Sequence, residues 1–186
     1  MGLGERDAAV VDPEWVRELL RRYERPLLQY AAAVGGPEHA RDVVQDTFVR
    51  LCTQAPKGIE NHVAAWLFTV CKNRALELRR SERRLTPIEE DDLPPNPDSG
   101  PATKLEQKEN MSRVGAAVAA LSEPYREALL LKVDGGLTYK EIAKLMDLTV
   151  GHVGLILHNA IAEIRERLAK QEKPGTIARR ETGRAP

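Results

Sequence analysis

Aromatic residues are scarce in this sequence: its 186 residues include two Trp, four Tyr and two Phe. Sandwich and barrel folds usually contain more, and the leaning toward Ala, Leu, Arg and Glu favours helices. The two cysteines, Cys52 and Cys71, are too few for a disulfide scaffold or a four-thiolate zinc site. We expect both to be free thiols in a cytoplasmic protein, and to be small buried residues on helices.

Long apolar runs are also lacking. The longest nearly apolar run, Ala64 to Cys71, is far too short to cross a bilayer, so we expect no membrane insertion. The first ten residues lack the basic start and apolar core of a signal peptide. Charge of one sign does not dominate either, because 28 Lys and Arg balance 28 Asp and Glu. A uniformly basic nucleic-acid binder is excluded, but a segregated charge pattern is not.

Motifs for catalysis and for cofactors are absent from the sequence. It contains no Gly-rich phosphate loop, no Walker motif, no His-Glu-x-x-His zinc helix and no nucleophile elbow. The four histidines are scattered, and surface or loop positions are the better interpretation of them than metal ligands. We therefore expect a binding protein that is not an enzyme and that uses no metal and no cofactor.

A proline-rich acidic segment divides the chain. Residues 85–111 carry 2 basic and 7 acidic groups, a balance of −5, and include Leu93-Pro94-Pro95-Asn96-Pro97. Proline forbids a continuous helix, so the segment is typical of an extended linker. We predict an all-α protein of two small helical domains, residues 12–84 and 112–170, the second a helix-turn-helix domain. The tail, residues 171–186, is predicted to be disordered.

The first domain shows helix start and stop signals. Asp12-Pro13-Glu14 combines an N-cap acceptor, an initial proline and an acid near the positive end of the helix. Pro26 is expected to kink or split this helix before Gly35-Gly36 ends it. A second helix follows, with Asp42, Gln45 and Asp46 on the polar face opposite Val43 and Val44.

A third helix, from about residue 62 to residue 84, is apolar first and basic later. Its basic half can neutralise phosphates, and Asn73 can form paired hydrogen bonds with a base edge. Trp66 and Phe68, earlier on the same helix, suit stacking with unpaired bases. A solvated basic face with a buried Trp is the alternative, and the helix alone does not decide between them.

The second domain carries a helix-turn-helix pattern. Thr138 and Glu141 form a capping box at the start of a short helix. Asp147-Leu148-Thr149 then turns the chain, and Thr149 caps a last helix that runs to about residue 170. Two short helices, a tight turn and an apolar inner face are typical of the motif.

Four segments, in order, resemble the bacterial extracytoplasmic-function (ECF) sigma factors of the sigma-70 superfamily. These segments are Asp42-Val43-Val44-Gln45-Asp46-Thr47-Phe48, Trp66-Leu67-Phe68-Thr69-Val70-Cys71-Lys72-Asn73, Leu121-Ser122-Glu123-Pro124-Tyr125-Arg126-Glu127 and Leu137-Thr138-Tyr139-Lys140-Glu141-Ile142-Ala143. The resemblance implies a factor that binds core RNA polymerase, directs it to promoter DNA and helps to open that DNA. It also implies regulation by an anti-sigma factor or another regulator.

The resemblance assigns residues to three surfaces. The polymerase-binding residues it implies are Asp42, Gln45 and Asp46. Those implied for recognition and melting of the −10 element are Lys57, Asn61, His62, Trp66, Lys72, Asn73, Arg74, Arg79 and Arg80. Those implied for the −35 element are Thr149, Gly151, His152, Leu155 and Asn159. The acidic linker resembles the family segment that passes through the polymerase near the RNA path.

The recognition helix departs from the family pattern, because no Lys or Arg lies between Lys144 and Arg165. Phosphate contacts dominate non-specific affinity, so we expect this helix to bind duplex DNA weakly. Two alternatives stay open: a stand-alone helix-turn-helix regulator, and an interaction module whose last helix binds a regulatory protein through Leu155 and Ile156. The first domain argues against the stand-alone regulator, which would not need the polar helix or the Trp66–Asn73 segment.

Overall fold

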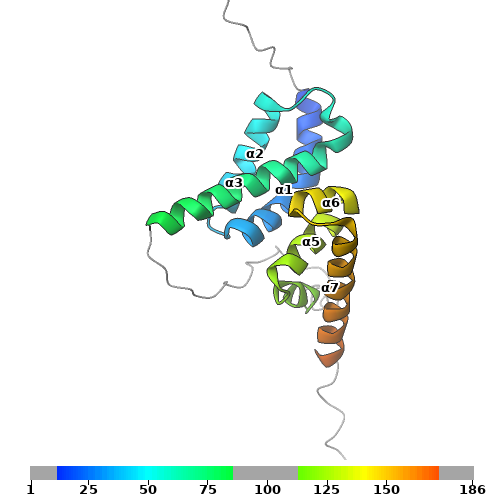
Figure 1. Cartoon of the computed structure of the whole chain (residues 1–186). Coiled ribbons are helices and arrows are strands. Elements are labelled where there is room, and N and C mark those ends of the chain that lie inside the picture. Colours follow the sequence, from blue (N-terminus) through cyan, green and yellow to red (C-terminus); the bar gives the residue numbers. More distant parts are fainter. Residues whose placement is uncertain (1–11, 86–112, 172–186) are drawn as a thin grey trace, which may run out of the picture.

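The computed structural model describes residues 12–85 and 113–171 (Figure 1). Within these ranges every regular element is a helix, which confirms the all-α prediction. The helices are α1 (Pro13–Gly35), α2 (Ala40–Gln54), the short 3₁₀ helix η1 (Ile59–His62), α3 (Val63–Leu85), α5 (Glu123–Val133), α6 (Tyr139–Met146) and α7 (Val150–Gln171). Residues 113–119 are also helical. Except for their end residues, Leu85 and Gln171, the predicted linker and tail lie outside the described residues.

The start of α1 follows the predicted signals. The Asp12 side chain accepts a hydrogen bond from the Glu14 amide at 3.0 Å, and Pro13 occupies the first helical position. Pro26 lies inside the helix, which nonetheless continues to Gly35. Of the two predicted outcomes at Pro26, a kink or a split, the split does not occur. Packing of α1 along α2 and α3 over its length compensates for the hydrogen bond that a proline cannot donate.

Helices α1, α2 and α3 pack against one another as the first bundle. α1 and α3 approach closely at Gly35, where a Cβ atom would lie 2.8 Å from the Ala75 Cβ. Only a residue without a side chain fits at that crossing. Cys71 of α3 is fully buried in this bundle, as predicted, but Cys52 of α2 is exposed, which corrects the expectation that both are core residues. Cys52 lies on the solvent-facing side of α2, and other residues of the helix form its buried side.

The second half of the chain forms the predicted helix-turn-helix. Both hydrogen bonds of the Thr138–Glu141 capping box are present at the start of α6. Asp147 ends α6 in the left-handed conformation, at φ 56°, and Thr149 Oγ1 accepts a hydrogen bond from the His152 amide at 3.2 Å to begin α7. Buried Ile142 and Val153 fix α6 against α7.

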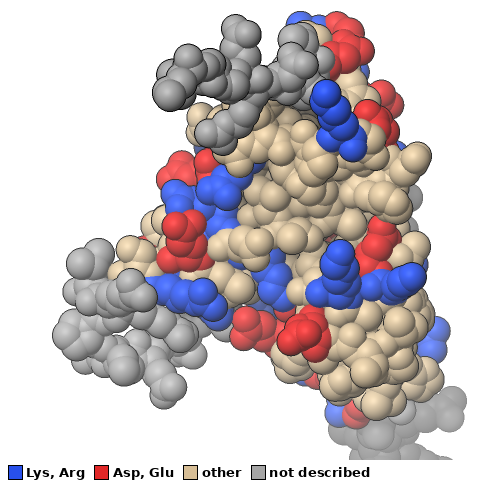
Figure 2. Space-filling model, turned by 45° about the horizontal axis from the view of Figure 1, so that its top comes forward, with Lys and Arg blue, Asp and Glu red and all other residues tan. Residues whose placement is uncertain are grey.

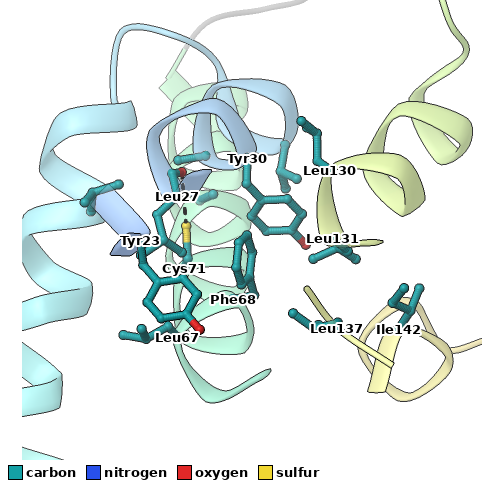
Figure 3. Packing of buried hydrophobic residues seen from close by; sticks show 14 of the residues in the cluster. Tyr23, Leu27, Tyr30, Leu67, Phe68, Cys71, Leu130, Leu131, Leu137 and Ile142 are labelled. Carbon is teal, nitrogen blue, oxygen red and sulfur yellow. Dashed lines mark hydrogen bonds between the residues drawn. The ribbon is translucent and has the colours of Figure 1, made fainter. Parts of the chain in front are cut away.

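The two halves share one buried apolar cluster (Figure 3). The Tyr30 ring of α1 meets the Phe68 ring of α3 edge to face, with 5.2 Å between centroids. Leu130 and Leu131 of α5 and Leu137 before α6 lie toward these rings from the other half. The helix-turn-helix half therefore packs on α1 and α3, as Figure 1 shows, instead of standing apart from them.

No described helix is by itself long and apolar enough to cross a membrane. One pair, α6 with Val150–Lys170 of α7, passes the test of length and composition together, and these two helices are bent 99° from each other. Much of the apolar surface of the pair lies in the shared core, including Ile142, Val153 and Leu157.

Candidate polymerase and nucleic-acid interface

The polar face of α2 lies on the outside of the first bundle. Asp42 and Gln45 are exposed, while Val43 and Val44 are buried beneath them. Asp46, in contrast, is half-buried and lies between two guanidinium groups. Its Oδ2 is 3.3 Å from Arg50 Nε and 3.2 Å from Arg74 Nε. Only part of the predicted polymerase-binding set is thus available to a partner without breaking internal contacts.

Arg74, assigned to DNA by the resemblance, also pairs with Glu77 at 2.9 Å on its own helix. Its ion pair with Asp46 ties α3 to α2. The structure therefore joins a residue of the predicted polymerase surface to a residue of the predicted −10 surface.

Lys72 lies at the contact between the two halves. Its Nζ donates hydrogen bonds to Glu127 Oε1 at 2.7 Å and to the Leu145 carbonyl at 3.2 Å. The side chains of Lys72 and Glu127 are only 20% and 14% exposed. The Tyr30 hydroxyl donates to the same Glu127 oxygen at 2.8 Å. Burial, and then the neighbouring carboxylate of Glu127, raises the pKa of Tyr30 far above its usual range, so Tyr30 is a neutral donor.

Arg79 has structural partners too. Its guanidinium donates to the Val34 carbonyl at 3.0 Å, near the end of α1, and lies 3.4 Å from Glu123 of α5. The last carbonyls of a helix accept no hydrogen bond from within the helix. Arg79 supplies the missing donor for one of these carbonyls.

Other residues of the predicted −10 surface are exposed to solvent. They are Lys57, Asn61, His62, Asn73 and Arg80. Trp66 is half-buried at the edge of the core. Phe68 is fully buried against Tyr30, which corrects the expectation that it stacks with an unpaired base. His62 Nδ1 lies 3.8 Å from Glu141 Oε1, which brings the end of η1 next to the capping box of α6.

The capping box has an electrostatic consequence for Glu141. Hydrogen bonding from the Thr138 side chain is the largest effect on Glu141 and lowers its pKa. Burial opposes it, and the Thr138 amide and His62 make smaller contributions that lower the pKa further. The ionised carboxylate is the form that accepts these hydrogen bonds.

The exposed face of α7 carries no charge near its start. Thr149, Gly151, His152 and Leu155 are all exposed, and the Leu155 side chain is 56% accessible. Asn159 is half-buried, and its side-chain amide donates to the Tyr125 hydroxyl at 3.4 Å. Asn159 thus contacts α5, whereas the other four residues predicted for the −35 element face outward.

Ile156 is buried, at 5% exposure, and packs with Val153 and Leu157 in the core. One sequence-based alternative treats Leu155 and Ile156 together as a protein-binding pair. Of the two, only Leu155 is exposed and accessible to a partner. A helix places successive residues 100° apart, so adjacent residues cannot both lie at the centre of one face.

Charges of both signs occur together on the surface. On the face drawn in Figure 2, Lys and Arg lie beside Asp and Glu around a broad uncharged area. Three of the basic residues assigned to DNA also have carboxylate partners, namely Lys72, Arg74 and Arg79. Sequence reasoning did not identify Glu127 as the partner of Lys72 and of Tyr30, because no spacing along the chain links residues 55 and 97 positions apart.

Comparison with known proteins agrees with this arrangement. Residues 19–85 match the Sigma-70 region 2 family, and residues 111–164 match the Sigma-70, region 4 family. SigE of Mycolicibacterium smegmatis, described as an ECF RNA polymerase sigma factor, is 30% identical over 166 residues. The chain belongs to the ECF sigma factors of the sigma-70 family. In this sigma factor, region 2 comprises α1 to α3, and region 4 comprises the helices from residue 113 onward.

The relatives differ in length from this sigma factor. The alignment covers 85% of this chain and 63% of SigE, and 58% of this chain and 59% of RpoE of Cereibacter sphaeroides, which is 31% identical over 109 residues. The chain thus spans less than two thirds of these two relatives. SigM of Bacillus subtilis is 27% identical over 157 residues, which are 82% of this chain and 92% of SigM.

Solved structures share the fold. The sigma factor RpoE from Bartonella quintana, in complex with the anti-sigma factor NepR, has a TM-score of 0.59 and 23% identity. The structural match covers 84% of this chain and 97% of the RpoE chain. CnrH, in complex with the cytosolic domain of CnrY, has a TM-score of 0.53 and 22% identity, over 88% of this chain and 93% of its own. At this identity the likeness concerns the fold alone.

Proposed function

We propose that this ECF sigma factor binds core RNA polymerase, directs it to promoters and helps to open promoter DNA. It acts in the cytoplasm, where polymerase and DNA are, and has no catalytic role of its own. The observation that carries the proposal is the match to region 2 and region 4 in one chain and in family order. A stand-alone DNA-binding regulator would need the helix-turn-helix and not the region 2 bundle.

The exposed face of α2 supports the polymerase contact. Asp42 and Gln45 lie outside on a helix whose opposite side is buried, so they are available to a partner without a change in fold. Lys57, Asn61, His62 and Asn73 are likewise accessible for the melted −10 strand, where base edges are exposed.

The test is transcription by core polymerase with and without this protein. A library of randomised promoter fragments replaces the unknown promoter, and transcripts are selected and sequenced. We expect the protein to produce discrete start sites that core polymerase alone does not. Lack of any such start site, together with lack of a complex with core polymerase in gel filtration, would refute the proposal.

We further propose an anti-sigma factor as a second partner. Two of the structural neighbours are complexes with another protein: the sigma factor RpoE with the anti-sigma factor NepR, and CnrH with the cytosolic domain of CnrY. The neutral face of α7, with exposed Leu155, suits a protein partner better than phosphates. Pull-down with immobilised protein, comparing the parent with Leu155→Glu, tests whether this face is used.

A further inference from the structure

Three side chains able to bind a metal meet at the corner between α1 and α2. Glu38, His39 and Glu82 each place one ligand atom so that the three atoms lie within 4.8 Å of one another. His39 Nε2 contacts Glu82 Oε1 directly. Spacing along the chain does not indicate this group, because 43 positions separate His39 from Glu82. The fold thus brings together residues that the sequence keeps apart.

The packing of α3 on α1 holds Glu82 at this corner. Ala75, Arg79 and Glu82 follow one another at spacings of four and three residues, so they lie on one face of α3. At Ala75 the two helices are in close contact, since a Cβ atom at Gly35 would lie 2.8 Å from the Ala75 Cβ. One turn later, Arg79 donates to a carbonyl near the end of α1 at 3.0 Å. The next turn brings Glu82 to His39.

The turn between α1 and α2 presents the other two ligands. Gly36 ends α1 at φ 104°, where glycine is favoured, and its amide donates to the Ala32 carbonyl. A Cβ atom at Gly36 would clash with Glu38 Oε1, so the missing side chain leaves room for this carboxylate. His39 is the residue before α2, and its side chain makes no capping hydrogen bond. The imidazole is therefore not needed to start the helix.

The chemistry of the group suits a divalent transition-metal cation. A neutral imidazole and two carboxylates carry a total charge of −2, which balances the charge of such an ion. Imidazole nitrogen with carboxylate oxygen is a ligand set typical of Zn²⁺, whereas Mg²⁺ and Ca²⁺ prefer oxygen ligands alone. Glu38 and Glu82 are exposed, and the His39 side chain is 25% exposed, so an ion can reach the group from solvent.

Side-chain rotation is enough to close the group around an ion. Bonds of about 2.1 Å place two ligand atoms of a tetrahedral zinc ion about 3.4 Å apart. The three ligand atoms already lie within 4.8 Å, and the two glutamates are exposed side chains that can rotate. Closing the group therefore requires no movement of a helix. A fourth position remains for water, as in zinc sites with three protein ligands.

From this geometry we propose that Glu38, His39 and Glu82 bind one divalent transition-metal cation of the zinc class, which ties the α1–α2 corner to α3. The ion replaces the direct contact between His39 and Glu82 and adds Glu38 as a third ligand. Because His39 directly precedes α2, the ion also fixes the start of that helix. The site is independent of the proposed function, since its three residues lie outside the surfaces assigned to polymerase and promoter DNA.

Titration of the chelator-treated full chain with Zn²⁺ tests the site. Cys52→Ser is the reference chain, because the exposed Cys52 thiol can itself bind zinc. We expect one zinc ion per chain by isothermal titration calorimetry. Zinc should also raise the thermal unfolding midpoint, since a ligand that binds the folded state stabilises it. Mg²⁺ in excess should not displace the zinc.

Single substitutions in the reference chain identify the ligands. Glu82→Gln keeps the size of the side chain and removes its charge. It should weaken zinc binding at least about tenfold, because loss of even an outer-shell group costs a metal site about that much. His39→Gln should have the same effect. Glu77→Gln is the matched control: the same change, on the same helix, at the 63%-exposed partner of Arg74. This control should change zinc affinity less than about twofold, because salt screens exposed charges.

Several results would overturn the proposal. One is a titration without detectable zinc binding, and another is displacement of the zinc by Mg²⁺. Equal weakening by Glu82→Gln and Glu77→Gln would reduce the effect to general surface charge. Half a zinc ion per chain would place the ion between two copies. If His39→Gln loses helicity in circular dichroism, Glu38→Gln replaces it, and unchanged zinc affinity in that variant also overturns the proposal.

Discussion

The Nε atom of Arg74 lies 3.2 Å from Asp46 Oδ2, so the predicted polymerase surface and the predicted −10 surface share an ion pair. Both side chains are about one third exposed, at 31% and 33%. Arg50 supplies a second guanidinium to the same oxygen at 3.3 Å. A change at Asp46 or Arg74 therefore alters the packing of α2 on α3 as well as any contact with a partner.

Arg74→Ala should lower the free energy of unfolding by about 1 kcal/mol, since a half-buried carboxylate loses one of two partners. It should also weaken core polymerase binding, because Asp46 then keeps only one of its two ion-pair partners and its carboxylate is less well positioned. Urea unfolding and competition binding measure the two effects. Arg50→Ala, which removes the other partner of Asp46, is the control. Weaker DNA binding with unchanged polymerase binding would show that Arg74 acts on DNA alone.

Asp42→Ala with Gln45→Ala is the clean test of the polymerase surface. Both residues are exposed, so the double variant should unfold within about 1 kcal/mol of the parent. Binding to core polymerase should fall at least about tenfold if the pair contributes as much as a few interface side chains do. Adding Asp46→Ala would confuse the result, because Asp46 holds Arg74. Full polymerase binding by the double variant would contradict the assignment of this face.

Two basic residues on the exposed face of α7 should restore duplex binding. Gly151→Lys and Leu155→Arg replace outward-facing residues, and no other group lies within 4 Å of a Cβ placed at Gly151. Two added phosphate contacts should steepen the slope of log affinity against log salt by about 2. Fluorescence anisotropy of the full chain with duplex DNA at several salt concentrations measures it. An unchanged slope would show that this face does not meet DNA.

Ile156→Arg should behave differently from Leu155→Arg. Ile156 is 5% exposed and Leu155 is 56% exposed, so only the first change buries a charge. We expect Ile156→Arg to destabilise the protein by several kcal/mol, about 3 or more, and Leu155→Arg to cost less than about 1 kcal/mol. Thermal unfolding followed by circular dichroism compares them. Equal stability of the two variants would place Ile156 outside the core.

The α6 capping box should make stability depend on pH. The pKa of Glu141 is lowered in the folded protein from its usual 4.5, chiefly by the Thr138 side chain. A lowered pKa means that this stabilisation is complete above pH 4.5 and is lost as the pH falls through the folded value. Thr138→Ala should cost about 1 kcal/mol at neutral pH and less in acid. Urea unfolding at both pH values, with Thr149→Ala as the control cap, checks this.

The general architecture could be predicted from sequence because its signals are local. Asp12-Pro13, the Thr138–Glu141 box and the Thr149 cap each act within three residues, and all three form as expected. Helix α1 is not split at Pro26, because packing of α1 on two neighbours outweighs one missing hydrogen bond. Local propensity is a weak guide where tertiary contacts are extensive.

The site was only partly predictable, because its decisive contacts join distant residues. Exposure of Asn73 follows from helical periodicity. The partners of Lys72 and Arg79 lie on α5 and the end of α1, and no pattern in a single sequence identifies them. The adjacent pair Leu155 and Ile156 shows the same limit, since the packing of α7 decides which of the two is buried.

The buried cluster that runs without interruption from α1 and α3 into α5, α6 and α7 makes the two halves one thermodynamic unit. Heat should therefore unfold the described regions in a single cooperative transition, with equal calorimetric and van 't Hoff enthalpies. Separation of the halves would expose Tyr30, Phe68 and the facing leucines to water, and exposure of apolar surface raises the heat capacity.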